Sequence, residues 1–248
     1  ELAAQREELE KIERNRPTSR SSYFGIVDLA GFPKDRYYLY KSRWLPDTPM
    51  VHILPHWNFP DRIGQVTPVF VYSSGDEVEL FLNGESLGKK VKQPYEYRFR
   101  WDSVVYQPGE LIAVAYKQNR KWAEASVKTT GDAIRLKAEP DKTVIKADGE
   151  DLVFVKVSFE DKDGNAVPTA ENMITCTLEG DGEIVATDNG DPTCLITFSE
   201  PARPAFNGLF LAIIKAKRNG VRPLRLTITS EGLEKATVDI KIGSATKY

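Results

Sequence analysis

Hydrophobic and polar residues alternate along short segments from Val69 onward, and turn residues separate these segments. Val78, Leu80 and Leu82 point one way while Glu79 and Phe81 point the other, and Asn83-Gly84 follows directly. A period of two places successive side chains on opposite faces of a β-strand, and Asn-Gly supplies the positive φ values of a tight hairpin. The pattern therefore predicts a β-hairpin here.

Two further strands are predicted in this first unit. Residues 111–116 form a nearly continuous apolar segment after Pro108-Gly109, and residues 122–128 follow a turn at Asn119-Arg120. The unit ends near Thr130-Gly131. About 80 residues with about seven strands are typical of a small immunoglobulin-like sandwich.

A second unit with the same pattern begins at Ile134. Val153, Val155, Val157 and Phe159 alternate with polar or outward-facing residues, and the alternation returns at 224–228 and 238–242. One polar face per strand favours antiparallel pairing, because buried parallel strands are apolar throughout. We therefore expect a mainly β chain of two tandem immunoglobulin-like antiparallel β-sandwiches, preceded by a short helical segment.

The first 45 residues follow a helical pattern instead. Glu1–Arg16 carries Leu2, Leu9 and Ile12 at heptad-like spacing before Pro17, which predicts a helix with one narrow apolar stripe. Two heptads are too few for a self-pairing coiled coil, so docking on the rest of the chain is expected.

A second helix is expected within the aromatic-rich stretch from Asp35 to Trp44. Tyr37, Tyr40 and Trp44 recur at i, i+3 and i+7 and give it one aromatic face. We expect three parts: residues 1–45, a first sandwich at 46–131 and a second sandwich at 132–248.

The composition of the chain excludes some classes of binding partner. The 248 residues contain 34 Lys and Arg against 36 Asp and Glu, which leaves a formal net charge of −2. Such a chain has no long-range field to attract polyanions or anionic lipid, so neither nucleic acid nor a membrane is expected as a partner. No apolar run approaches the roughly 18 to 20 residues of a bilayer span, and a soluble chain is expected.

The cysteines and the acidic turns are expected to have structural roles and not to bind a metal ion. Cys176 and Cys194 lack the spacing of a zinc site and are expected to be separate thiols. Asp161–Asn165 departs from the calcium-loop template and is expected to be a hairpin turn. In Asp188–Pro192, Asp188 and Asp191 are candidate cation ligands, although a turn network is favoured; no metal or other cofactor is expected.

His52 and His56 are the only histidines. His56, Trp57 and Asn58 stand side by side, and this combination of rings and an amide suits either a sugar site or a packed interface. Interface packing is favoured. Trp57, together with Trp44, is the tryptophan that we expect a ligand to reach.

Several motifs resemble those of one protein family and occur in the same order along the chain as in that family. Ser19–Asp28, Gly31–Asp35 and Tyr37–Tyr40 resemble the end of the catalytic barrel in bacterial glycoside hydrolase family 2 β-galactosidases. His52–Phe59 and Val78–Gly84 resemble the sandwich that follows this barrel. Three further motifs of this sequence resemble the family's next immunoglobulin-like domain: Ala147–Gly149, Asp188–Pro192 and Phe206–Leu209.

The resemblance also implies what this chain lacks. Enzymes of the family use two glutamates on barrel strands, and a retaining mechanism holds them about 5 to 5.5 Å apart. The sequence shows neither the family's Asn-Glu pair nor most of the barrel. We therefore assign no catalytic residue and expect the chain alone to be inactive, as a non-catalytic accessory region of such an enzyme.

The remaining roles follow from the same resemblance. Ser22, Tyr23 and Phe24 would approach the sugar-binding mouth of the intact barrel, and His56 with Trp57 would lie against it. The implied partners are the missing barrel and, through it, an oligosaccharide, in a periplasmic or secreted setting. Self-association is a further expectation, because a barrel remnant leaves apolar side chains to be covered.

Two other functions stay open at this point. One is a carbohydrate-binding module that stacks a sugar on an exposed Trp57 or Trp44. The other is a structural or adhesion protein built from immunoglobulin-like domains, since such a fold alone does not establish a function.

Overall fold

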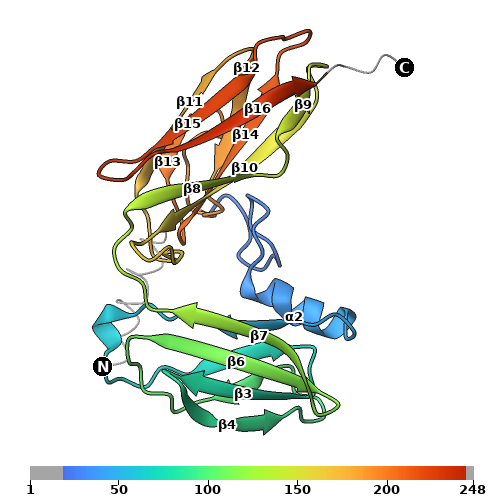
Figure 1. The fold of residues 1–248 in the computed structure, drawn as a ribbon, viewed down its shortest axis with the longest axis vertical. Helices are drawn as coiled ribbons and strands as arrows, with labels where there is room; N and C mark the ends of the chain where they lie inside the picture. The colour runs from blue at the N-terminus through green and yellow to red at the C-terminus, as the bar shows by residue number, and fades with distance from the viewer. Residues whose placement is uncertain (1–18, 244–248) are drawn as a thin grey trace, which may run out of the picture.

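The computed structural model describes residues 19–243 as two β-sandwiches that follow one another along the long axis of the molecule (Figure 1). The helix expected at 1–16 lies outside the described residues. Helix α2, Asp35–Trp44, matches the expected aromatic helix. No helix within 19–243 is long and apolar enough to cross a bilayer.

The first sandwich packs a three-stranded sheet on a four-stranded one. The three-stranded sheet has the order β1-β2-β5 and is formed by Val51–Leu54, Val69–Ser73 and Phe99–Trp101. The four-stranded sheet has the order β4-β3-β6-β7 and is formed by Glu85–Val91, Glu77–Leu82, Glu110–Lys117 and Arg120–Lys128. All neighbouring strands in both sheets are antiparallel.

The predicted hairpin is confirmed. β3 and β4 flank Asn83 and Gly84, which have φ values of 51° and 85°. Val78, Leu80 and Leu82 all point into the core, as the alternation requires. The turn between β6 and β7 uses Gln118 and Asn119, one residue earlier than expected, because these two residues have the positive φ values.

The second sandwich is larger. Its four-stranded sheet has the order β12-β14-β10-β8 and is formed by Gly182–Asp188, Leu209–Ala216, Leu152–Glu160 and Arg135–Pro140. Its five-stranded sheet has the order β13-β11-β15-β16-β9 and is formed by Ala202–Pro204, Met173–Glu179, Leu224–Thr229, Ala236–Gly243 and Val144–Lys146. Pairing is antiparallel except between β9 and β16, which run parallel.

The core of the second sandwich comes from alternating positions on facing strands. Val153, Val155, Val157 and Phe159 of β10 are fully buried. They pack with the inward side chains of β14, β15 and β16 in one cluster. Burying each such side chain contributes about 1.5 to 3 kcal/mol to folding, so this cluster is the main source of the sandwich's stability. The predicted class, mainly β with two sandwiches, is confirmed; the boundaries at 45/46 and 131/132 stay predictions.

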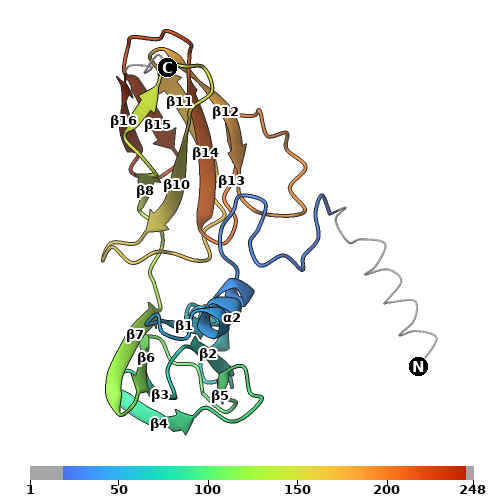
Figure 2. The ribbon, with the colours of Figure 1, turned by 90° about the vertical axis from the view of Figure 1, so that its right-hand side faces the viewer.

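The segment before the first sandwich bridges both units. Residues 19–34 lie beside the end of the second sandwich, and the chain then continues into α2, which packs on β1 and β2 (Figure 2). A short 3₁₀ helix, Pro60–Arg62, follows β1. The path places residues 19–45 on one side of the molecule, where they contact both sandwiches.

Candidate functional site

A groove of about 570 Å³ lies between residues 23–35 and the end of the second sandwich. Tyr23, Phe32 and Phe206 give it aromatic surface, and Lys34, Asp191 and Asn207 add charged and amide groups. Rings combined with hydrogen-bonding side chains form the lining on which a polar ligand with apolar faces, such as a sugar, is held.

Arg20 holds the start of this segment against the second sandwich. Its backbone N–H donates to the carbonyl of Pro192 at 2.6 Å, and its guanidinium donates to the carbonyl of Ile196 at 3.2 Å. The same guanidinium lies 4.7 Å from the centre of the Phe198 ring, a cation–π contact. One residue thus makes three contacts with the loop between β12 and β13.

Asp28 holds the middle of the segment. Its carboxylate accepts the N–H of Phe32 at 2.9 Å, which closes a tight turn, and it faces Gly190 so closely that a Cβ at Gly190 would overlap it. Burial raises the pKa of Asp28, and the Asp188 carboxylate adds to this, against the lowering effect of backbone hydrogen bonds.

The loop that receives Asp28 is the predicted turn network. Asp188 Oδ1 accepts the N–H groups of Asn189 and Gly190 at 2.7 and 3.1 Å, and Asp191 Oδ1 accepts the N–H of Thr193 at 2.8 Å. These Asx-type bonds confirm the interpretation of this loop as a turn. Within 19–243, no three His, Cys, Asp or Glu side chains are grouped to hold a metal ion.

A buried arginine lies beneath this loop. Arg203 of β13 has no exposed surface, and its guanidinium donates to Thr187 Oγ1 and to the Thr197 carbonyl, both at 2.8 Å. It also lies 3.9 Å from Asp188 and 3.8 Å from Cys194 Sγ. Arg203 therefore ties both ends of the loop that contacts Asp28.

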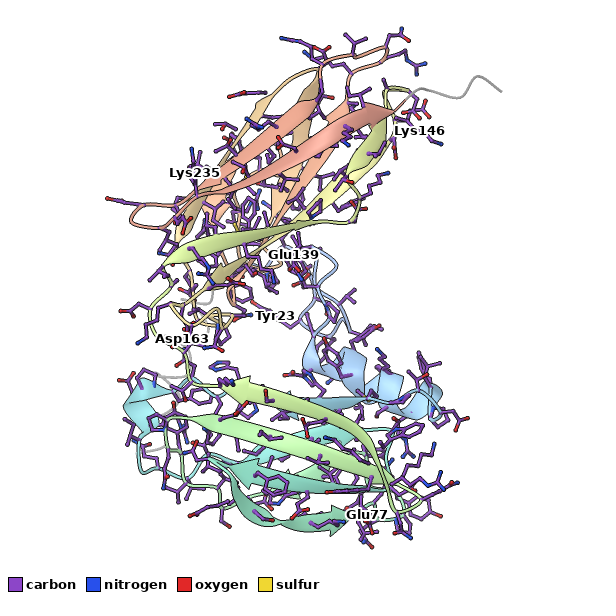
Figure 3. The ribbon with its side chains drawn as sticks, viewed as in Figure 1. Tyr23, Glu77, Glu139, Lys146, Asp163 and Lys235 are labelled. Carbon is purple, nitrogen blue, oxygen red and sulfur yellow. The ribbon has the colours of Figure 1, made fainter. Side chains whose placement is uncertain are left out.

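Ser22, Tyr23 and Phe24 form an exposed corner of the segment. The N–H of Phe24 donates to Ser22 Oγ at 3.2 Å, and Lys34 Nζ donates to the Tyr23 carbonyl at 3.3 Å. Tyr23 lies at the level between the two sandwiches (Figure 3). Phe24 is 79% exposed, a high value for an apolar ring.

Helix α2 is attached through its inner face. Tyr38 stacks on the His52 ring with centroids 3.8 Å apart, and His52 Nε2 lies 2.7 Å from Asp35 Oδ1. On the outer face, Tyr40 and Trp44 pack on each other at 4.9 Å, and Trp44 is 70% exposed. The helix thus leaves an aromatic pair uncovered.

Trp57 corrects one expectation from the sequence. The side chain is 0% exposed and packs against Tyr106 at 4.8 Å, and its indole N–H donates to the Gln107 carbonyl at 2.9 Å. The expectation that a ligand reaches Trp57 is therefore wrong, because the indole belongs to the core of the first sandwich.

The neighbours of Trp57 lie at the junction of the sandwiches. His56 stacks on Phe59 at 4.4 Å, and burial lowers its pKa, against a smaller raising effect of Asp35. Asn58 Nδ2 donates to Thr130 Oγ1 at 2.9 Å and to Thr169 Oγ1 at 3.4 Å. Asn58 therefore links the first sandwich to the linker and to the second sandwich.

The predicted site residues do not lie together in one site. Ser22–Phe24 lie by the groove, Trp44 is exposed on α2, and His56–Asn58 lie at the junction. Sequence reasoning missed Asp28, Lys34 and Asn207 as groove residues and Arg203 beneath the loop. A charged residue in the short strand Ala202–Pro204 was the available signal for Arg203.

The family models match both sandwiches. Residues 136–239 match the glycoside hydrolase family 2 C-terminal domain 5, and residues 64–123 match a domain of unknown function, DUF4982. The β-galactosidase BoGH2A of Bacteroides ovatus is 42% identical over 225 residues, which is 90% of this chain and 26% of that protein.

The chain belongs to the C-terminal region of glycoside hydrolase family 2.

Two other relatives agree with this family 2 assignment. A putative β-glucuronidase of Formosa agariphila is 38% identical over 175 residues, covering 68% of this chain and 16% of that protein. The crystal structure of a β-glycosidase from Bacteroides vulgatus superposes with a TM-score of 0.85 at 30% identity, covering 90% of this chain and 28% of that one. The family 2 region therefore spans about a quarter or less of the length of the curated relatives it matches.

Proposed function

We propose that this family 2 region is the non-catalytic C-terminal accessory part of a β-galactosidase, with residues 19–45 seated against the catalytic barrel. One observation carries the proposal. Residues 19–45 contain the motifs that resemble the family's barrel end, contact both sandwiches, and still leave large apolar side chains exposed. These are Tyr23, Phe24, Val27, Leu29, Tyr40, Trp44 and Leu45, referred to below as the apolar edge.

The apolar edge has the character of a surface made to be covered. Single exposed apolar residues are common, but seven within 23 consecutive residues are an unusually dense set, and such concentrations of exposed apolar surface are typical of protein contacts. The segment is also fixed by Arg20 and Asp28 on one sandwich and by Tyr38 and His52 on the other. A barrel seated here would be held by both sandwiches.

The groove gives the region a role beside the substrate. Tyr23 forms part of its wall, and the opposite wall contains Asp191 and Asn207 of the second sandwich. A substrate that extends out of the barrel mouth past Ser22, Tyr23 and Phe24 would meet this lining. The second sandwich thereby flanks the substrate path and takes no part in bond cleavage.

The groove's carboxyl groups are the residues to test for hidden catalysis. Asp28, whose pKa is raised, lines the groove together with Asp191, and two carboxyl groups in one groove can serve as acid and base. Both Asp28 and Asp191, however, accept hydrogen bonds from their own turns, which favours a structural role. We expect no turnover of a chromogenic β-galactoside by the purified chain; turnover that Asp28→Asn or Asp191→Asn abolishes would overturn the proposal.

The substrate of the whole protein is proposed as a β-galactoside. The β-galactosidase relative is 42% identical over 225 residues, against 38% over 175 residues for the putative β-glucuronidase. Assaying the full-length gene product on paired chromogenic galactoside and glucuronide substrates separates the two. Faster hydrolysis of the glucuronide would contradict the galactoside assignment.

A carbohydrate-binding role for Trp44 is the second candidate. Its ring is the more exposed member of the Tyr40–Trp44 pair, which suits stacking on a sugar as well as on a barrel. Titration of the chain with oligosaccharides, followed by tryptophan fluorescence, tests it. A saturable change that is absent in Trp44→Ala would favour this role over barrel docking.

A further inference from the structure

The connection from β4 to β5 contains a turn with an unexpected residue. The N–H of Glu96 donates to the carbonyl of Gln93 at 3.2 Å, so Gln93-Pro94-Tyr95-Glu96 is a four-residue turn with Pro at its second position. Tyr95 occupies the third position with φ of 65°. Turns with Pro second and positive φ third normally place Gly or Asn there, because a Cβ is strained in that conformation.

Within residues 19–243, no packing explains a tyrosine at that position. The Tyr95 side chain is 92% exposed, and Tyr97, two residues further on, is 66% exposed. A left-handed conformation in a residue other than glycine is usually maintained by surrounding structure or by function. A ligand that packs on the ring would supply the support that residues 19–243 do not give it.

A polar hollow of about 440 Å³ lies beside this turn. Its lining includes Gln93 and Glu96 of the turn itself, Lys90 of β4 and Arg100 of β5. Within residues 19–243, Lys90, Lys92 and Arg98 have no carboxylate within ion-pair distance, whereas Arg100 pairs with Asp102 at 2.9 Å. Arg98 instead lies over the Phe70 ring at 4.3 Å.

Charge is concentrated here although the chain as a whole is slightly acidic. Residues 89–102 contain five Lys and Arg against two acidic residues, whereas the whole chain has a net charge of −2. Burial lowers the pKa of Lys92, and the nearby Arg43 cation adds to this. An anion bound at the hollow would be attracted to Lys90 and Arg100, the two cations of its lining.

We propose that the Tyr95–Tyr97 turn and the hollow beside it form a binding site for an acidic saccharide, a chain that carries uronic acid carboxylates. The two exposed rings offer apolar faces on which pyranose rings stack. Lys90, which lines the hollow and has no ion-pair partner within residues 19–243, supplies a cation for a carboxylate, and Arg98 directly after Tyr97 supplies a second positive charge beside the turn. The side-chain amide of Gln93 is a further group that can hydrogen-bond to hydroxyls.

The residues of this site favour an acidic saccharide as the ligand over a nucleic acid or a protein. The two tyrosines are surrounded by charged residues, so the site lacks the broad apolar centre of a protein interface. With 34 Lys and Arg against 36 Asp and Glu, the sequence as a whole has no excess of the basic residues that nucleic-acid binding requires. The site lies in the first sandwich and does not depend on where the barrel docks.

Isothermal titration of the 248-residue chain with a galacturonic acid tetrasaccharide tests the proposal, with neutral galactotetraose as the comparison. We expect the acidic tetrasaccharide to bind at least tenfold more tightly than the neutral one, and the binding to weaken as salt is raised. Tyr95→Asn, Tyr97→Ser, Lys90→Gln and Arg98→Gln each weaken it about tenfold or more. Val221→Ser and Lys162→Gln, at exposed residues of the second sandwich, leave it unchanged.

Stability supplies the second readout. Asn tolerates the left-handed conformation better than Tyr, so Tyr95→Asn keeps or raises the melting temperature while binding is lost. A Tyr95→Asn chain that melts at a lower temperature would show that the ring is structural. Equal affinity for both tetrasaccharides, or unchanged binding by Tyr95→Asn, would also overturn the site.

Discussion

Arg203 shows how one buried charge organises a loop that sequence reasoning treated only as a turn. Its guanidinium reaches Thr187 and Thr197, on either side of Asp188–Pro192, and lies near the Asp188 carboxylate. A buried cation requires such partners, because taking it from water is costly without them. The loop's shape, and with it the position of Gly190 against Asp28, therefore depends on a residue one strand away.

Replacing Arg203 by methionine should destabilise the second sandwich strongly. The change keeps the volume roughly equal, but it leaves the nearly buried Asp188 carboxylate without its cation and the Thr197 carbonyl without its donor. Removing one partner of a buried pair costs about 3 to 5 kcal/mol, which urea unfolding would measure. Arg225→Met is the matched control: Arg225 pairs with Asp239 on the surface, and a much smaller change is expected. Equal losses from both variants would show that the buried guanidinium has no special role.

Asp161 has a comparable role at the linker between the sandwiches. Burial raises its pKa, but the N–H groups of Asn165, Gly131 and Asp163 outweigh this and hold the pKa below its usual value. A lowered pKa in the folded state means that the ionised form stabilises the fold above about pH 4, and that this stabilisation is lost as the pH falls through the lower folded value.

Asp161→Asn should therefore be least stable, relative to the original chain, near neutral pH. The amide keeps one acceptor oxygen but turns an NH₂ group toward backbone N–H donors, which costs about 1 to 3 kcal/mol. Urea unfolding at pH 7 and at pH 3 would measure the difference, which should shrink at pH 3. A difference that grows on acidification would contradict the assignment of the ionised carboxylate as the stabilising form.

At the scale of elements, the contact between residues 19–34 and the second sandwich depends on how closely Asp28 approaches the backbone of Gly190. Gly190 has φ of 77°, and a Cβ there would overlap the Asp28 carboxylate, whereas Gly232, with φ of 75°, has open space around it. The two glycines share a backbone conformation and differ in their neighbours. They form a matched pair for testing the contact.

Gly190→Ala should loosen the N-terminal segment, while Gly232→Ala should not. Both variants incur the strain of a side chain at positive φ, about 1 kcal/mol, but only Gly190→Ala also displaces Asp28. Hydrogen exchange of the amides at 26–34 would detect this as faster exchange in Gly190→Ala alone. Similar exchange in both variants would show that Asp28 does not hold the segment.

The elements that sequence predicted well are those with a strict local period. The β3–β4 hairpin and strand β10 followed from alternation and Asn-Gly, because burial on one face requires period two. The parallel pairing of β9 with β16 was not foreseen, since residues 144–146 and 241–243 meet only in the folded sandwich. Trp57 was misplaced for the same reason: its burial depends on Tyr106 and Gln107, about 50 residues away.

The candidate site was less predictable than the fold. Ser22–Phe24 came from the barrel resemblance, but the groove exists only where that segment meets Asp191 and Asn207. Sequence periodicity does not predict which distant loops come into contact. Tyr95 carried a readable signal, because Pro94 before it and Glu96 after it form a turn that prefers glycine.

At the scale of the whole molecule, the apolar edge should make the isolated chain self-associate. Phe24 and Trp44 are the most exposed of its rings, and water-exposed apolar area favours contact between copies. Light scattering should show a mass that rises with concentration and falls toward the monomer in Phe24→Ser/Trp44→Ser. Val221→Ser, which removes an equally exposed apolar side chain elsewhere, is the control. A concentration-independent monomer mass would argue that the edge needs no cover.

The two cysteines give this architecture a built-in chemical handle. Burial raises the pKa of the Cys176 thiol to about 12, so almost none of it is the reactive thiolate at neutral pH. Cys194 is only partly buried and belongs to the loop that Arg20 grips. A maleimide dye would thus attach at a single position in the native sequence, and its emission would report docking and release of the N-terminal segment without engineering any residue.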